Sequence, residues 1–477
     1  MVLRIGVPEA DVSAPDMGMA QIVRSISYEG LTGRSNDGRP IPLLAESWSS
    51  SPDGLRWNIR IRNNVTFHDG VHLSASIARE SLLSSVTSRN VQALYPGLAD
   101  IDSITPEGDH ELVIALKKPS SFLLDDLSVA ITRSADKKTI GTGPFKQVSE
   151  SEGRIEFEPH PAYYLGKPKI DRIVVTPYPA LRTAWASLMR DEIDMLWDVA
   201  QDAREFVQTG DVETHSYLRH WQYLIAFNSK HPKFAAGPVR RALNAAVDRT
   251  ALIKDVLKGR GLVANGPFWP LHWAYDQSLP GYTFDPSLAA TTLQAVRGRV
   301  LSKKDAQIPR LSFVCILPEN RALWERIGLN VQKQLYDAGV DMQLQALPAD
   351  EWDKRLRSGN FEASLIEIIS GPSFARAYQF WRSTDGFRGL NVFGYHNPQA
   401  DRWFDALRYS NGEAEYRAAA GQVQRVLLED PPALFLAWNE RTRAVNRRFH
   451  VPVEPGRDPI ATLWKWAPRD PRGSTTH

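Results

Sequence analysis

Hydrophobic and polar residues alternate over a short stretch near residue 60. Trp57, Ile59 and Ile61 alternate with three polar side chains, which predicts a half-buried β-strand. A tight turn rich in proline and glycine precedes this strand, and a second short strand is predicted over 65–67 before a further glycine turn. The pattern therefore predicts a compact β unit between residues 42 and 70.

Apolar residues recur at helical spacing farther along the chain. The clearest helix covers 238–247, and Asp248 is placed to cap the next one, as Ser74 caps a helix that runs to about residue 86. The strand–helix–strand order over 311–347 predicts a parallel crossover. Other strands are expected at 112–117, 155–158, 170–177, 192–195, 224–228 and 362–369, and other helices at 19–28, 121–131, 183–190, 352–356, 398–409 and 413–429. This mixture indicates an α/β fold.

Composition narrows the class of protein. The 477 residues are enough for two or three domains, and 43% are hydrophobic and 23% charged, as in ordinary globular proteins. A net charge of +2 is too small to indicate a nucleic-acid partner or a membrane surface, so neither is expected. No stretch of 18 apolar residues is present. Cys315 is the only cysteine, so it forms no internal disulfide, and its apolar neighbours predict a small buried hydrophobic residue.

Candidate catalytic and metal-binding groups are weak. His68 and His72 are four residues apart, but Gly70 lies in a turn between them, so they should not share a helical face, and no metal or cofactor is expected. No nucleophile elbow, zinc-protease motif or phosphate loop is present. The acidic pairs at 125–126 and 191–192 are expected at the solvated surface. A glycosidase-type carboxylate pair is left open without positive support.

Aromatic residues are a stronger signal. The chain has 14 Trp, 14 Tyr and 18 Phe, and several stand at junctions between predicted elements. Such side chains suit a cleft for a small organic ligand, although each could instead be an ordinary core residue. The junction aromatics are Tyr95, Trp221, Tyr223, Phe268, Trp269, Trp273, Tyr378, Trp381 and Trp438.

Several motifs resemble a known family. The phrases PLLAESW at 42–48, FHDG at 67–70, GTGPF at 141–145 and VRRALNAAVDR at 239–249 occur in an order and spacing similar to the family 5 extracellular solute-binding proteins. That family includes oligopeptide-, dipeptide- and nickel-binding components of ABC importers. The resemblance implies a two-lobed periplasmic-binding-protein fold of type II with an inserted domain. Lobe I would hold 1–32, 139–232 and 440–477, the inserted domain 33–138, and lobe III 233–439.

The resemblance also implies a function without catalysis. A small solute would bind between lobes I and III, hinge closure would exclude water, and the loaded protein would dock on an ABC permease. A monomer is expected, in the periplasm or outside the cell. Residues 1–6 show no signal-peptide pattern, which leaves two alternatives, a cytosolic protein or a leader that was removed. The resemblance favours the removed leader. The aspartates that hold a peptide's amino terminus are missing from 366–374, where Glu367 is the nearest carboxylate, which argues against a typical peptide ligand.

Position within that fold selects the candidate site. Arg376 is a candidate clamp for a carboxylate, with a surface arginine as the alternative. A ligand sensor on the same fold and a hydrolase of a small polar substrate remain alternative functions. The candidate ligand-binding residues are Asp16, Met17, Met19, Tyr95, Trp221, Tyr223, Ser370, Gly371, Ser373, Arg376, Tyr378 and Trp381.

Overall fold

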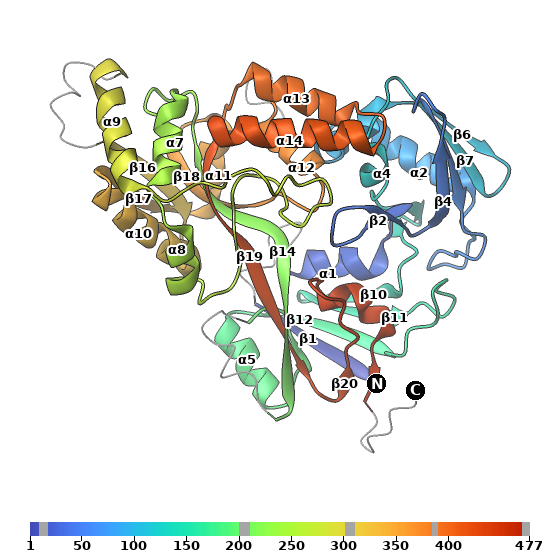
Figure 1. Cartoon of the computed structure of the whole chain (residues 1–477). Helices are drawn as coiled ribbons and strands as arrows, with labels where there is room; N and C mark the ends of the chain where they lie inside the picture. The colour runs from blue at the N-terminus through green and yellow to red at the C-terminus, as the bar shows by residue number, and fades with distance from the viewer. Residues whose placement is uncertain (9–17, 200–209, 301–310, 384–389, 470–477) are drawn as a thin grey trace.

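The computed structural model describes residues 1–8, 18–199, 210–300, 311–383 and 390–469, and no side chains over 296–300. An eleven-stranded sheet runs through the molecule in the order β10-β11-β12-β1-β13-β19-β14-β18-β16-β17, with β15 (Leu262–Val263) paired to β19. Two long strands cross from one half of this sheet to the other (Figure 1). The α/β fold is confirmed.

The first half of the large sheet is built from the two ends of the chain and a middle segment. β1 pairs in parallel with both β12 and β13, so Leu3, Ile5 and Val7 are fully buried. Helix α1 and the 3₁₀ helix η4 pack beside this half. The elements are β1 (Val2–Pro8), α1 (Gly18–Ser27), β10 (Phe145–Ser151), β11 (Arg154–Pro159), β12 (Arg172–Tyr178), α5 (Leu181–Met189), β13 (Met195–Leu196), β20 (Phe449–His450), η4 (Pro459–Lys465) and β21 (Ala467–Pro468).

The second half carries two hydrophobic cores, one on each face. Leu224 and Ala226 point into one core while Ile225 and Phe227 point into the other, as strand alternation requires. The predicted parallel crossover is confirmed, because Leu311–Pro318 pairs in parallel with Val340–Leu347. The elements are α7 (Gly237–Ala245), α8 (Arg249–Asp255), α9 (Pro286–Val300), β16 (Leu311–Pro318), α10 (Ala322–Asp337), β17 (Val340–Leu347), α11 (Ala349–Ser358), β18 (Ala363–Ile369), α12 (Ala375–Trp381), α13 (Pro398–Arg408) and α14 (Glu413–Glu429).

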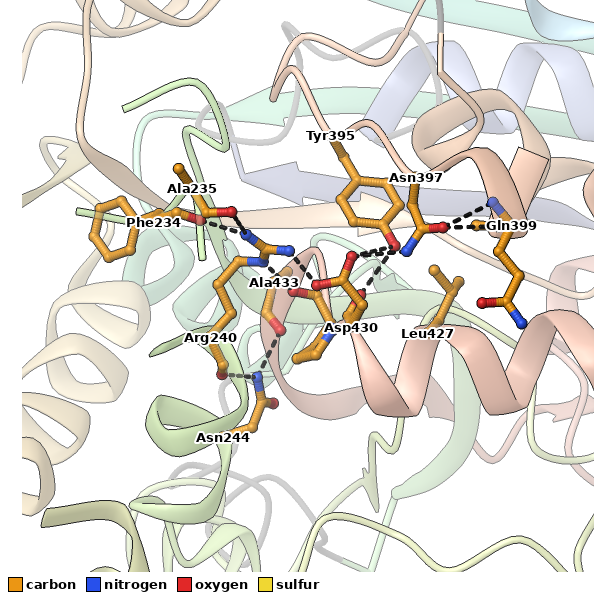
Figure 2. Close-up of polar contacts among 12 residues, drawn as sticks. Phe234, Ala235, Arg240, Asn244, Tyr395, Asn397, Gln399, Leu427, Asp430 and Ala433 are labelled. Carbon is orange, nitrogen blue, oxygen red and sulfur yellow. Dashed lines mark hydrogen bonds and ion pairs between the residues drawn. The ribbon is translucent and has the colours of Figure 1, made fainter. Parts of the chain in front are cut away.

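Buried polar contacts hold the helices of this half in place (Figure 2). The Arg240 guanidinium donates to the carbonyls of Phe234 and Pro431 and pairs with Asp430. Asp430 also accepts from Asn397, whose side-chain oxygen caps the start of α13. The buried Arg240 charge is thereby paired and hydrogen-bonded inside the protein.

The two halves share strands β14 (Val212–Phe227) and β19 (Ala433–Asn446). Their antiparallel ladder shifts register between Leu218 and Gln222, which marks a β-bulge. On one side of the bulge β19 also pairs with β13, and on the other side β14 pairs with β18. The bulge is thus the place where the continuous sheet can bend.

A separate four-stranded antiparallel sheet lies within the predicted inserted region. Its order is β4-β5-β7-β6, and it has its own hydrophobic core. Arg408 of α13 joins it to the second half through a buried ion pair with Asp100 at 2.7 Å. The elements are β2 (Thr32–Arg34), β3 (Pro40–Pro42), β4 (Ala45–Ser50), β5 (Arg56–Ile61), α2 (Ala75–Thr87), α3 (Arg89–Leu94), η2 (Pro96–Asp100), β6 (Ile101–Glu107), β7 (Glu111–Leu116), α4 (Leu123–Asp126), β8 (Arg133–Ala135) and β9 (Lys138–Ile140).

Most local predictions are confirmed, and a few are wrong. Ser74 and Asp248 cap their helices as expected. Residues 65–67 form an isolated bridge rather than a strand, because the 67–70 turn returns the chain at once. The helix expected over 121–131 is only the four-residue α4. The acidic pair at 125–126 is buried rather than solvated, because it faces the junction with the second half.

Candidate functional site

A cleft of about 510 Å³ lies beside the bulge of β14. Its walls come from three parts of the chain: α1 and η4 of the first half, β2 of the inserted region, and the segment that leads from β18 into α12. Trp221 stands at the bulge and packs its ring against the Arg219 guanidinium, 4.7 Å from the ring centroid. The cleft is therefore bounded by the first half, the inserted region and the second half, and these parts would move relative to one another if the sheet bends at the bulge.

Arginines dominate the polar lining of the cleft. Five arginines face it against two acids, Glu29 and Asp458. Asp458 already forms a two-point ion pair with the buried Arg443, with one contact at 2.8 Å. Arg34, Arg219 and Arg457 in turn face acidic side chains outside the lining, so the count of arginines does not give the net charge of the cleft. The five arginines are Arg24, Arg34, Arg219, Arg376 and Arg457.

Glu367 is held in an ionic network behind the cleft. Its side chain is 2% exposed and accepts from Arg219 at 3.3 Å and from Asn439 at 2.5 Å. Arg441 approaches its other oxygen at 3.7 Å. These contacts neutralise Glu367, so it does not offer an open carboxylate to the amino terminus of a peptide.

Glu29 is held by hydroxyl groups at the end of α1. Its carboxyl accepts from Tyr163 at 2.9 Å, Tyr164 at 3.0 Å and Thr142 at 2.9 Å. Burial raises the pKa of Glu29 to about 7, although these three hydrogen bonds and Arg62 oppose the rise. The negative charge of the cleft lining is accordingly smaller than the count of acids suggests.

A second hollow of about 630 Å³ lies on another side of α1. Arg24 and Tyr28 line both spaces, so the hollow adjoins the cleft. Tyr95 reaches it from the inserted region, and its hydroxyl accepts a hydrogen bond from Arg24. The remaining walls are largely apolar and include Met19 and Ile155.

The structure brings some of the predicted site residues to these spaces. Trp221, Gly371 and Arg376 line the cleft, and Met19 and Tyr95 line the second hollow. Arg376 is 9% exposed and donates to the Leu94 carbonyl at 2.8 Å. Asp16 and Met17 fall outside the described residues. The ligand-binding role of all these residues remains a prediction.

The other predicted site residues are buried, except Tyr378, which is partly buried. Trp381 and Tyr223 are fully buried in hydrophobic cores. Ser370 is buried, and the Ser373 hydroxyl donates to Asp125. For Tyr378, the hydroxyl accepts from Arg408 at 2.8 Å, and the ring meets Phe122 edge-on. Their burial favours the core role that the sequence left open for the aromatic residues.

Sequence reasoning missed one group of lining residues that had a readable signal. Gln21, Arg24 and Ser25 share one face of α1 at helical spacing, Tyr28 follows directly after the helix, and all four line the cleft. Arg219 and Arg457 had no such signal, because an isolated arginine in a strand or loop reads as a surface residue.

His68 and His72, the histidine pair that the sequence singled out, do not belong to a metal-binding cluster in the described part of the chain. No three His, Cys, Asp or Glu side chains gather there to hold a metal ion. His68 instead contacts the His160 ring edge-on and the Gly143 carbonyl at 2.9 Å, and burial lowers its pKa to about 4. None of the helices described is long and apolar enough to span a bilayer.

Comparison with known proteins identifies the family. The family model for bacterial extracellular solute-binding proteins, family 5, matches residues 39–387. The chain belongs to this family. It is 26% identical to the oligopeptide-binding protein AppA of Bacillus subtilis, over 89% of this chain and 82% of that protein. It is 25% identical to the glutathione-binding protein GsiB of Pectobacterium atrosepticum, over 90% and 86%.

Solved structures support the same fold. NikZ from Campylobacter jejuni, in complex with Ni(L-His), superposes with a TM-score of 0.83 at 23% identity and covers 98% of this chain and 99% of its own. The two-lobed fold of periplasmic binding proteins is thus confirmed. Family 5 is made up of substrate-binding proteins found in the periplasm or outside the cell. This family 5 member is accordingly a solute-binding protein of the ABC-importer type.

Proposed function

We propose that this protein captures a small organic solute in the cleft at the β14 bulge, closes its lobes around the solute and delivers it to an ABC permease. One observation carries the proposal: walls from the first half, the inserted region and the second half meet at one cleft of about 510 Å³. A volume of this size suits a small organic ligand. A solute in it would contact both lobes at once.

The bulge supplies a physical basis for closure. Between Leu218 and Gln222 the β14–β19 ladder is interrupted, and a second register shift follows between Tyr223 and Leu224. Bending at the interruption changes few hydrogen bonds, so the two halves can rotate as units. A solute that contacts both halves stabilises the closed state more than the open one, which is all that ligand-driven closure requires.

We propose binding without catalysis. The family consists of substrate-binding proteins, and the acids near the cleft are held by donors: Asp458 and Glu367 by guanidinium groups, Glu29 by hydroxyls. A hydrolase would need an acid and a base with access to the substrate. We further propose that the protein acts outside the cytoplasmic membrane as a monomer, and that nucleic acid is not a partner.

A thermal-shift screen tests the proposed function. Peptides, sugars, amines, organic acids and metal chelates are each added to the purified protein. A solute at about 100 times its Kd should add about 2.7 kcal/mol of stability by mass action. The bound solute should be recovered unchanged after denaturation, as judged by mass spectrometry. Recovery of a chemically altered product would refute a purely binding role.

A substitution at the bulge localises the binding. Trp221→Ala removes a partly buried lining ring and should weaken the solute found in the screen at least tenfold, while Trp57→Ala, in the inserted sheet, should not. Equal affinity of the Trp221 variant and the unmodified protein would place the binding site elsewhere.

A further inference from the structure

We propose that the β2–β3 hairpin, residues 32–42, is a strap that fastens along the cleft to the second half and must release before a solute enters. This inference rests on the proposed solute-binding function and adds the element that controls access to the site. It follows from three features of the hairpin: its place in the cleft wall, its small separate sheet, and the contacts made by its tip.

The hairpin forms part of the cleft wall. Thr32, Gly33 and Arg34 of β2 line the cleft on the side of the inserted region. Pro372 lines it on the side of the second half, and the Pro372 carbonyl oxygen lies against Gly38 in the hairpin tip. The hairpin therefore reaches from one wall of the cleft to another, so its position decides how widely the two walls can separate.

The hairpin is anchored at its base and is a small sheet of its own. Strands β2 and β3 pair only with each other, over three residues of each strand. At the base, the Thr32 hydroxyl donates to the Leu124 carbonyl at 2.6 Å. Within the tip at 35–39, the Ser35 backbone N–H donates to the Arg39 carbonyl at 2.9 Å, which holds the tip together as a unit. A two-stranded ribbon has little stability alone, so the tip is placed by what it contacts.

Backbone carbonyls of the tip are bound by two tryptophans of the second half. The Asn36 carbonyl accepts from the Trp269 indole N–H at 2.9 Å. The Asp37 carbonyl accepts from the Trp273 backbone N–H at 3.0 Å. Both acceptors belong to the strap and both donors to the second half, so these hydrogen bonds exist only while the strap is fastened.

Arg39 adds a charged contact to the same place. Its guanidinium pairs with Glu413 of α14 at 2.6 Å and lies 4.5 Å from the centroid of the Trp273 ring. The side chains of Arg39 and Glu413 are 43% and 66% exposed, so water competes with the pair. An exposed ion pair is weak on its own, and a cation over an exposed ring adds a comparable amount. The tip is therefore held firmly enough to favour the fastened position and weakly enough to release.

These contacts give the strap a simple part in solute capture. Release of the tip breaks contacts at partly exposed residues and leaves the anchored base in place. Segments that admit ligands generally come from the less stable parts of a fold, as this hairpin does. A solute that touches both β2 and the second half stabilises the fastened position, because the released strap no longer offers both surfaces together.

Hydrogen exchange followed by mass spectrometry measures release of the tip in the solute-free protein. The Trp273 amide is bonded to Asp37 only while the strap is fastened. Arg39→Gln should therefore speed exchange in the peptide that contains Trp273 by about threefold or more. Arg56→Gln is the matched control, because it breaks another exposed ion pair, with Glu107 at 2.9 Å, and it should leave this exchange unchanged.

A methyl group at residue 38 tests the seat of the tip. Gly38 has a φ of 82°, and a Cβ there would lie 2.8 Å from the Pro372 carbonyl oxygen. Gly38→Ala should therefore lift the tip and speed exchange at Trp273 by about tenfold or more. Gly108→Ala is the matched control: its φ is 73°, so it carries similar backbone strain, but its Cβ would meet open space. It should not change exchange at Trp273.

Thiol labelling measures access to the cleft. Ile369→Cys places a thiol on the cleft wall, whereas the native Cys315 is fully buried and gives little background. N-ethylmaleimide and N-(1-pyrenyl)maleimide react by the same chemistry and differ in size. The ratio of the pyrenyl rate to the ethyl rate should rise by about threefold or more when Arg39→Gln or Gly38→Ala is added. A ratio that neither substitution changes would overturn the strap.

Failure of this inference and failure of the proposed function have different signatures, because the exchange and labelling measurements use no solute. Trp273 exchange that is the same in the unmodified protein, Arg39→Gln and Gly38→Ala would overturn the strap, even if the thermal-shift screen finds a solute that is recovered unchanged. A chemically altered product in that screen would overturn the binding-only role instead, whatever the exchange and labelling rates show.

Discussion

Glutamine in place of Glu29 should remove a pH dependence from the stability of the protein. Glutamine has the shape of the protonated acid: its carbonyl oxygen can accept from Tyr163 and Tyr164, and its amide nitrogen can donate to Thr142. The hydrogen bonds around residue 29 are therefore preserved. What the change removes is a group that titrates with a pKa of about 7 in the folded protein.

The direction of the effect follows from the raised pKa. Burial lifts the pKa of Glu29 from 4.5 to about 7, so the folded state holds this proton more tightly than the unfolded state does. The stabilisation is complete below about pH 4.5 and is lost as the pH rises through 7. At 1.36 kcal/mol per pKa unit the difference amounts to about 3 kcal/mol. Partial exposure of the side chain to solvent reduces the expected value to about 2 kcal/mol.

Urea unfolding at pH 5 and pH 8 measures this contribution. Other groups titrate in the same range, so the quantity of interest is the pH-dependent loss in the unmodified protein minus the loss in Glu29→Gln. That difference should be about 2 kcal/mol. Glu107→Gln, at an exposed acid in the inserted sheet, serves as the control and should leave the pH dependence unchanged. Identical pH profiles for the unmodified protein and Glu29→Gln would show that Glu29 is ionised at neutral pH and would refute the reasoning.

Three further substitutions test the packing around the site by urea unfolding. Trp381→Ala should cost about 3 to 5 kcal/mol, because the ring is fully buried and stacks on Phe393 at 5.2 Å; a loss below 1 kcal/mol would restore its predicted role in the cleft. Arg408→Ala should cost about 3 to 5 kcal/mol, because Asp100 would be left buried without its partner; a neutral result would mean that water reaches Asp100. Asp248→Ala should cost about 1 kcal/mol through loss of the helix cap, and no change would contradict the cap at 2.9 Å.

Local patterns predicted most elements because they depend on neighbours in sequence. The Asp248 cap and the alternation of Ile59 and Ile61 needed only a few adjacent residues, and both are confirmed. The long strands were underestimated: the expected strand at 224–228 is the buried end of a strand that begins at Val212. Its other half pairs with β19 far along the chain, and the mixed polar sequence there carries little periodic signal.

Positions in the family's fold predicted roughly where the site lies. They did not predict which side chains line it or their chemical character. Trp221 and Arg376 were selected for their place between lobes, and both line the cleft. Trp381, chosen for the same reason, belongs to the core. A helix of seven residues carries both Arg376 and Trp381, so only the packing of its two faces could separate them.

The sequence by itself determined the family, the α/β class and the expectation of a solute-binding protein, because motifs and periodicity are local and survive divergence. Tertiary structure alone decided which side chains share the cleft. More than 190 residues separate Arg24 from Arg219, and more than 230 separate Arg219 from Arg457. All three nevertheless line one cavity. The charge of that cavity is a sum over long-range neighbours, and no local pattern encodes such a sum.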